Sequence, residues 1–453
     1  MEKNQFRLAD VILSVICVVF VAEAAAPVAS IGNSQYFWWG FMILAFLLPY
    51  GLIAAELGTA YAGDGGLYDW IHAAYPEGKW AARASWYYWI NFPLWMASLA
   101  VMCPELLRDI TGRQMGTIAS LAVQLLFIWI VTLIACYPVC DSIVVLNVSA
   151  VIKILLALLV GGLGVWYISR YGFVNDMSAR TFLPSFDLTS LSYISVIIFN
   201  FLGFEVVCTF AGSMSEPKKQ IPQSIVTGGI VIAAIYLFSA FGIGAAVDVR
   251  EISVDSGLID AVSLILGADG GVLVAVVALL FLVTLFGNMI SWSMGVNSTA
   301  ALAADHNDMP RIFAKRWAKN NMPVGSAVAS GVCILGVLIE TVTPDSSLFW
   351  SFFALNLVML LLSYLPVFPA FLKLRRVDAK TPRPFRVPGS DAALRCIAYV
   401  PMALIIISII FTAVPLSFDA ETLKSFLPIT IGTILSAAIG EVLIALRGKT
   451  ARS

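Results

Sequence analysis

The sequence predicts an all-α membrane protein with twelve spanning helices, and three observations lead to this fold class. Of the 453 residues, 60% are hydrophobic and only 12% are charged, whereas a soluble domain carries roughly 25% charged residues. The mean hydropathy is +0.90. Apolar runs of about 20 residues, the length that crosses a bilayer as a helix, recur along the whole chain. This composition excludes a soluble protein, because no soluble core could bury so much apolar surface.

The predicted spans follow one another between charged or proline-containing connections. The first apolar run is too long for a cleaved signal peptide and lacks a small-residue cleavage site, so we expect it to be a span. In chain order the spans cover residues 9–32, 37–60, 85–107, 117–136, 143–167, 191–214, 223–247, 271–300, 324–342, 347–372, 395–416 and 426–446.

The basic residues indicate how the chain is oriented. An even number of spans places both termini on one side, and 20 of the 27 Lys and Arg residues fall on that side. Six fall on the opposite side, and Lys153 lies inside the fifth span. Since cytoplasmic connections carry the excess of Lys and Arg, we expect both termini in the cytoplasm and the protein in the plasma membrane.

Several classes of function are excluded by what the sequence lacks. It has only two histidines and no cluster of Cys, His and Asp with the spacing of a metal site, and it has no phosphate-binding loop or nucleophile motif. It also has no basic tail for nucleic acid. We therefore expect no metal, no cofactor and no enzymatic activity; a channel is disfavoured because no selectivity ring or pore repeat is visible.

Two acids inside apolar runs carry the functional prediction. Glu23 lies in the first span and Glu205 in the sixth. A carboxylate at bilayer depth costs at least about 2.5 kcal/mol on insertion scales, so such a residue indicates a functional site. Two of them predict a protein that handles cations.

The same two spans indicate internal symmetry. Glu23 is followed by Pro27, and Glu205 lies between Gly203 and Gly212 five spans later. Because five is odd, a repeat with this offset has inverted topology, and inverted repeats place their binding site at the interface near the bilayer midplane.

Five motifs in order along the chain resemble those of the amino acid–polyamine–organocation transporter superfamily. They are Arg7-Leu8-Ala9-Asp10, Ala55-Glu56-Leu57-Gly58-Thr59, Gly65-Gly66-Leu67-Tyr68-Asp69-Trp70, the tail of span six from Ser215 to Pro222, and the proline-rich run from Thr381 to Gly389. The run Trp86–Trp95 is similar to the bacterial branch of glutamate/GABA and amino acid/amine exchangers.

The resemblance implies a single transporter domain over residues 1–453. Its first inverted repeat would cover residues 9–167 and its second residues 191–372, with helices eleven and twelve at 395–446 outside them. It also implies that spans one and six are broken, that their unwound parts hold the substrate, and that transport proceeds by alternating access.

The span-one motif departs from the superfamily pattern. Many relatives have a Gly-Ser-Gly-like run that cradles a substrate carboxylate, but this chain has Ala22-Glu23-Ala24-Ala25-Ala26-Pro27. An ionised Glu23 would attract an ammonium group by roughly 4 kcal/mol at ~4 Å and an effective dielectric near 20, and would repel a carboxylate equally. With Ala22 and Ala26 beside it, this predicts a cationic amine as substrate: putrescine, agmatine or an aromatic amine. The alternative is a protonated Glu23 that faces another helix.

Two further charges are assigned by the resemblance. Glu205 matches the acid of span six that is implied to link protonation, the gate and the substrate; the alternative is a structural hydrogen bond between helices. Lys153 matches a lysine of span five that, in some sodium-independent relatives, occupies the place of a sodium ion beside span one. The alternative for Lys153 is a side chain that reaches the membrane surface.

The remaining candidates are less specific, and each could equally be a packing residue. Glu56, at the cytoplasmic end of span two, is interpreted as a structural or inner-gate residue. The candidates for contact with substrate are the aromatic residues Phe199 and Trp292, the amides Asn200 and Asn288, and Gly203 in the expected break.

The prediction is therefore a sodium-independent antiporter that exchanges a cationic amine for a related amine or its precursor amino acid. Alternatives that stay open are a neutral or acidic amino acid exchanger, a proton-coupled importer and, outside transport by a carrier, a channel. The partners expected are the small-molecule substrate and membrane lipid, in a monomer or homodimer.

Overall fold

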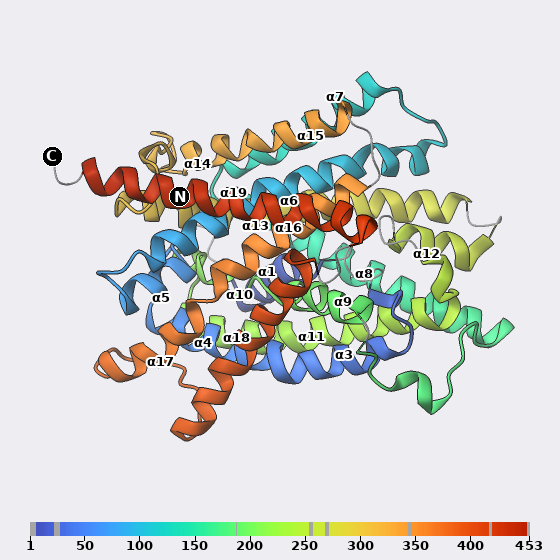
Figure 1. Ribbon diagram of the computed structural model, residues 1–453, viewed down its shortest axis with the longest axis horizontal. Helices are drawn as coiled ribbons and strands as arrows, with labels where there is room; N and C mark the ends of the chain where they lie inside the picture. The colour runs from blue at the N-terminus through green and yellow to red at the C-terminus, as the bar shows by residue number, and fades with distance from the viewer. Residues whose placement is uncertain are drawn as a thin grey trace.

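The structure is a computed structural model that describes residues 6–21, 28–186, 188–252, 257–267, 271–342, 347–415 and 419–450. Those residues form a bundle of long apolar helices, most of which run in roughly the same direction (Figure 1). Among them, nine helices are long and apolar enough to cross a membrane. Three shorter apolar helices cover Leu8–Val19, Tyr193–Cys208 and Val324–Ile339. Each of these twelve segments overlaps one of the predicted spans.

Apart from the short helix at Leu67–Ala74, which lies between the second and third predicted spans, the helices of the first half overlap the apolar runs that predict them. They are α1 (Leu8–Val19), α3 (Ser34–Met42), α4 (Leu48–Ala60), α5 (Leu67–Ala74), α6 (Trp80–Thr111), α7 (Thr117–Ala135) and α8 (Val139–Tyr171). A π-helical turn, η2 (Ile43–Leu47), joins α3 to α4. Pro49 follows it in the first turn of α4, and because proline has no N–H, it cannot close the α-helical hydrogen bond four residues back.

The second half is also helical. Its helices are α9 (Leu188–Phe199), α10 (Phe204–Cys208), α11 (Pro217–Ala246), α12 (Gly257–Leu266), α13 (Gly271–Asp305), α14 (Val324–Ala329), α15 (Ile334–Val342), α16 (Ser347–Tyr364), α17 (Val367–Val377), α18 (Asp391–Ala413) and α19 (Ala420–Thr450). The short helix α12 lies between the seventh and eighth predicted spans, where no helix was predicted.

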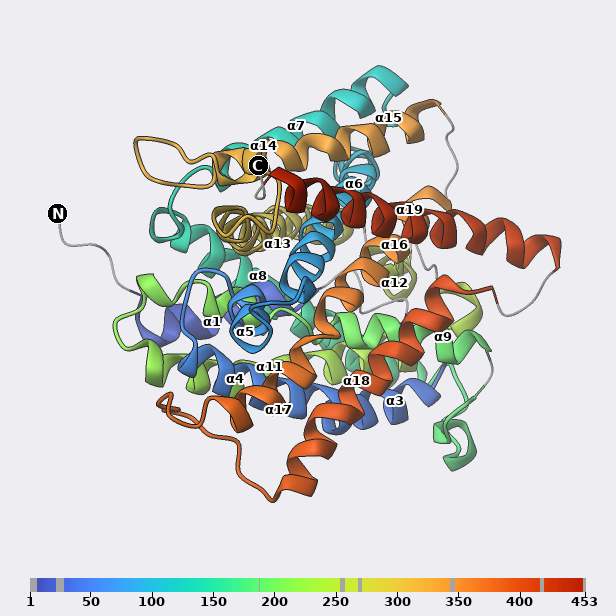
Figure 2. The same cartoon turned by 60° about the vertical axis from the view of Figure 1, so that its left-hand side comes forward.

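The first span stops early. The helix α1 ends at Val19, and Phe20 leaves it with extended backbone angles. In both views α1 lies inside the bundle (Figures 1 and 2), where it packs against α8, α11, α13 and α10. Its last carbonyls therefore end among other helices rather than in water, and they need partners from those helices.

The sixth span is interrupted between α9 and α10. Gly203 has φ +120°, a conformation that side chains rarely adopt. A Cβ at this position would also lie 2.8 Å from Val18 Cγ1 and 3.1 Å from the Trp292 ring. The glycine thus serves two purposes: it turns the chain at the break, and it lets the break approach α1 and α13.

Close helix contact also joins the fifth span to the seventh. A Cβ on Gly164 of α8 would lie 2.3 Å from the Cα of Gly242 in α11. Small residues at such crossings allow helix backbones to touch, which is how helices associate where lipid removes the hydrophobic drive between them. This contact keeps α8, with Lys153, firmly against the central bundle.

The outer helices present apolar side chains to the outside. Several leucine and isoleucine side chains of α7, α8 and α19 are more than half exposed. In Figures 1 and 2 α7 and α15 lie side by side along one edge, and α19 crosses the bundle. An apolar exterior over buried polar residues such as Glu205, Lys153 and Asn288 is the arrangement expected when the solvent is lipid.

Candidate substrate site

Glu205 lies in the first turn of α10, directly after the break in span six, and is fully buried. Two tyrosine hydroxyls hold its carboxylate. Tyr50 of α4 donates to one oxygen, and Tyr88 of α6 donates to the other at 2.7 Å. Tyr364 of α16 packs against both rings, with centroids 5.6 Å from Tyr50 and 6.4 Å from Tyr88. Four spans therefore meet at this acid.

The partners of Glu205 are neutral. Of the charged side chains that the structure describes, none forms an ion pair with it. Hydroxyl donors stabilise a carboxylate but do not neutralise it, so a buried ionised glutamate here is short of one positive charge. Such a site can accept either a proton or a cationic ligand.

Lys153 of α8 supplies the partners that the end of α1 requires. Its ammonium donates to the carbonyl oxygen of Cys17 at 2.6 Å and also to that of Phe20. The side-chain oxygen of Asn288, from α13, accepts a third bond at 3.1 Å. Lys153 is fully buried, so its charge is distributed over oxygen acceptors at the broken span rather than exposed to water.

Two more side chains bind the same backbone. The indole N–H of Trp292 donates to the carbonyl of Val18 at 2.8 Å. Two residues after the end of α1, the N–H of Val21 donates to the hydroxyl of Tyr236 at 2.8 Å. The unwound end of α1 is thus held by donors and acceptors from three other spans, which fixes where the chain leaves the helix.

Aromatic rings form one wall beside the break in span six. Trp95 of α6 meets Phe199 at a centroid distance of 5.2 Å and Trp292 at 5.5 Å, both edge to face. Phe199 also contacts Phe353 at 5.3 Å. Asn200, which begins the break, is fully buried. Rings of this kind can attract a cation held within about 6 Å of their faces.

Glu56 lies elsewhere and is bound differently. It is fully buried near the end of α4, where Arg375 and Arg383 both bind its carboxylate, with Nε–O distances of 2.8 and 3.1 Å. The N–H of Val387 donates to it at 2.7 Å. Glu56 therefore fastens α4 to the proline-rich connection after α17 and has no open position for a ligand.

The structure brings most of the sequence-predicted residues together. Phe199, Asn200, Gly203, Glu205 and Trp292 surround the break in span six, and Asn288 joins Lys153 at the end of α1. Glu56 belongs to a separate cluster. Predicted residues Ala22, Glu23 and Ala26 lie outside the described residues.

Sequence reasoning missed the tyrosines and Trp95. Tyr50 and Tyr88 are 155 and 117 residues from Glu205 in the chain, and Tyr236 and Trp95 lie among other aromatic residues of apolar helices. A phenol in such a helix looks like ordinary packing. The usable signal is that a buried tyrosine needs a partner for its hydroxyl, which a buried acid provides.

Comparison with known proteins agrees with this architecture. Residues 5–438 match the amino acid permease family model. The probable agmatine/putrescine antiporter AguD of Lactococcus lactis is 59% identical over 98% of this chain and 95% of its own length. The polyamine transporter RMV1 of Arabidopsis thaliana is 24% identical over 89% of this chain and 78% of its own.

More distant similarity reaches a second exchanger and a solved structure. The glutamate/gamma-aminobutyrate antiporter of L. lactis is 21% identical over 82% of this chain and 76% of its own length. The crystal structure of MhsT in complex with L-phenylalanine superposes with a TM-score of 0.61 at 16% identity, over 91% of this chain and 99% of MhsT, and so shows a shared fold. With a family match over nearly its whole length, the chain is a transporter that belongs to the amino acid permease family, as the motifs predicted.

Proposed function

We propose that this protein is a sodium-independent antiporter that exchanges agmatine for putrescine across a plasma membrane. The observation that carries the proposal is Glu205, a fully buried acid at the break of span six whose partners are the neutral hydroxyls of Tyr50 and Tyr88. The extent of similarity to the L. lactis protein supports the choice of substrates.

The charge of the two amines suits such a site. Putrescine carries two ammonium groups near neutral pH, and agmatine carries one ammonium and one guanidinium. Neither has a carboxylate that a buried acid would repel. One-for-one exchange of two dications moves no net charge, so the concentration gradients of the amines alone would drive it.

A second acid would complete the site. Glu23 is proposed to bind the other end of the amine, since it replaces the span-one run that accommodates a carboxylate in many relatives. Ala22 and Ala26 beside it are proposed to give the substrate access to the backbone. In this proposal the aromatic rings of Phe199 and Trp292 cover the bound cation, and Asn200 and Gly203 contribute polar groups of the unwound backbone.

Lys153 supports independence from sodium. Its ammonium already binds the carbonyls of Cys17 and Phe20, which are oxygen ligands of the kind that a sodium ion would take. A fixed charge at this position leaves no requirement for a bound ion. Complete replacement of sodium by choline should then leave exchange unchanged.

The topology proposed for transport has twelve membrane crossings and cytoplasmic termini. Residues 9–167 and 191–372 would form the two inverted repeats, with residues 395–446 outside them. The bundle of spans one, two, six and seven would rock against the rest, so that the site opens to one side at a time. The basic connection around Arg375 and Arg383, fastened to Glu56, would then lie on the cytoplasmic side.

Exchange in proteoliposomes tests the proposal. Vesicles loaded with putrescine should take up labelled agmatine, and empty vesicles should not. External putrescine should compete, whereas glutamate, GABA and arginine should not. Uptake of glutamate or another amino acid in preference to agmatine would overturn the substrate assignment, and uptake into empty vesicles at the same rate would overturn exchange.

A further inference from the structure

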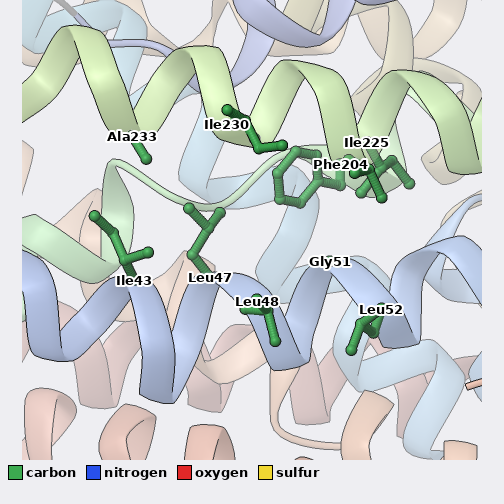
Figure 3. Close-up of a pocket in the computed structure, with 11 residues that line it drawn as sticks. Ile43, Leu47, Leu48, Gly51, Leu52, Phe204, Ile225, Ile230 and Ala233 are labelled. Atoms are coloured by element: carbon green, nitrogen blue, oxygen red, sulfur yellow. The ribbon is translucent and has the colours of Figure 1, made fainter. Parts of the chain in front are cut away.

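A groove of about 520 Å³ lies between α11 and the helix formed by η2 and α4, and no polar residue of the site lines it. Figure 3 shows Phe204 between the two helices, with Leu47 and Leu48 on one side and Ile225 and Ile230 on the other. All residues that line it are apolar. Its volume lies within the range of about 300–1,000 Å³ that is usual for pockets that bind small molecules.

The groove opens at the outside of the bundle. Leu48 and Ile230 at its edge are 53% and 66% exposed, and both belong to helices long and apolar enough to cross the membrane. Their exposed faces are therefore continuous with the apolar exterior that the bilayer covers. Water would gain no hydrogen bond from an apolar hollow of this kind, so hydrocarbon is the occupant that fits.

Positive charge lies at one end of the same helix. Lys218 and Lys219 are exposed at the start of α11, about 10 Å along the helix from Ile225 at 1.5 Å per residue. Lys219 also pairs with Glu216 at 2.6 Å. A phospholipid whose acyl chain lies in the groove could place its phosphate near these lysines, which attract the anionic lipids of the cytoplasmic leaflet.

The inner wall of the groove is part of the broken span. Phe204 is the residue before Glu205, and its ring lies 5.6 Å from that of Tyr50, which donates to Glu205. Small residues make room for an occupant beside this ring: a Cβ on Gly229 would be 3.8 Å from Phe204, and one on Gly51 would be 3.7 Å from it. An occupant of the groove would therefore contact Phe204, the first residue of α10, which carries Glu205.

We propose that this groove binds one acyl chain of an anionic phospholipid, with the phosphate near Lys218 and Lys219, and that the bound chain supports Phe204 and α10. This goes beyond the proposed exchange activity. The experiment that tests it measures binding of lipid, so its outcome does not depend on which amine is transported.

Photo-crosslinking tests the proposal on the full-length protein. The probe is phosphatidylglycerol with a diazirine on one acyl chain, incorporated into phosphatidylcholine vesicles that hold the purified protein. Crosslinked peptides identified by mass spectrometry should come mainly from residues 43–52 and 225–233. Even labelling of all the lipid-facing helices would overturn the proposal.

Two neighbouring substitutions give a matched pair. Ala233 lines the groove, whereas Ala234 is exposed next to it and is not part of the lining. Ala233→Leu should lower crosslinking in the groove at least fivefold, and Ala234→Leu should leave it unchanged. Equal crosslinking in both variants would contradict a specific site.

The headgroup has its own test. The double substitution Lys218→Gln and Lys219→Gln should lower labelling by the phosphatidylglycerol probe. The expected level is that of the wild type with the same diazirine on phosphatidylcholine. If wild-type labelling is the same with both headgroups, the lipid is not selected by charge and that part of the proposal is wrong.

Discussion

Glu56 and Glu205 are both fully buried glutamates, but the protein binds them in opposite ways. Glu56 accepts hydrogen bonds from two arginines and a backbone N–H, whereas Glu205 accepts them from two tyrosines. The first acid is neutralised within the fold. Hydrogen bonds hold the carboxylate of Glu205 in place but do not neutralise its charge. A site for a proton or a cation requires such an acid.

The different partners of the two glutamates also predict that Glu56 contributes to stability and Glu205 to transport. A buried acid with two cationic partners stabilises the fold only as a set, because the removal of one member leaves the others uncompensated. An acid held by hydroxyls can lose its charge without leaving a buried cation behind. Substitutions at the two glutamates should therefore affect different measurements.

The largest effect is expected at Glu56. Glu56→Ala leaves Arg375 and Arg383 buried without their carboxylate, which should destabilise the protein by about 3–5 kcal/mol. Thermal unfolding of the detergent-purified protein measures this. Glu441→Ala, which removes the more exposed partner of Arg83, is the control and should lower stability by about 1 kcal/mol or less. Equal losses in the two variants would contradict the structural role of Glu56.

Glu205→Gln should have a smaller effect on stability and a large one on exchange. Glutamine keeps an oxygen that can accept a bond from a tyrosine but cannot neutralise an amine, so we expect exchange of agmatine to fall about 100-fold, equivalent to about 2.7 kcal/mol. The unfolding temperature should change little. The pH dependence of the residual exchange should flatten; an unchanged profile would remove the proton role of Glu205.

Tyr88→Phe should have a moderate effect on the same site. It removes the 2.7 Å bond to Glu205, and a hydrogen bond to a charged group contributes about 1.5–3 kcal/mol. We expect the rate of agmatine exchange to fall about tenfold. Tyr87→Phe is the matched control, since Tyr87 lies near Arg83 and Glu441 instead; a loss of similar size there would argue against a specific bond.

The smallest effect concerns a third acid, Asp69, on α5 outside the predicted spans. Burial raises the pKa of this carboxyl to about 6, and the nearby Asp64 adds to the shift, although the N–H of Gly65 bonds to it at 3.0 Å. A folded pKa above the unfolded value favours the protonated folded state. The contribution of Asp69 to stability should therefore decrease as the pH rises from about 4 to about 6.

Thermal unfolding of the wild type and Asp69→Asn at pH 4.5 and pH 7 measures this contribution. The difference in unfolding temperature, wild type minus variant, should be larger at pH 4.5. An equal difference at the two pH values would contradict a raised pKa for Asp69 in the folded protein.

Much of the fold could be predicted because spanning helices are local features. Each apolar run contains enough residues to cross the bilayer, and its hydropathy is a property of the run itself. The breaks in spans one and six were expected from the resemblance, and in span six Gly203 and the nearby acid interrupt an otherwise uniform apolar stretch. The short helices α5 and α12 lie outside the predicted spans, because eight and ten residues are too few to cross the bilayer.

The partners of the buried charges were harder to predict from the sequence. Lys153 stands out in the sequence as the one basic residue deep in an apolar run, but the carbonyls that it binds belong to α1, more than 130 residues away. The acceptors are backbone atoms, which every residue has, so no side chain in α1 signals them. The same is true of the Val18 carbonyl that Trp292 binds.

From the residues alone it follows that the chain lies in a membrane, where most of its helices run, and which few charges are buried there. The partners of each charge depend on how the helices pack. A buried acid with arginines for neighbours is part of the scaffold, and the same acid with tyrosines is a candidate site. That difference depends on which distant helices pack together, because electrostatic energy in a low dielectric is set by separations of a few ångströms and not by position along the chain.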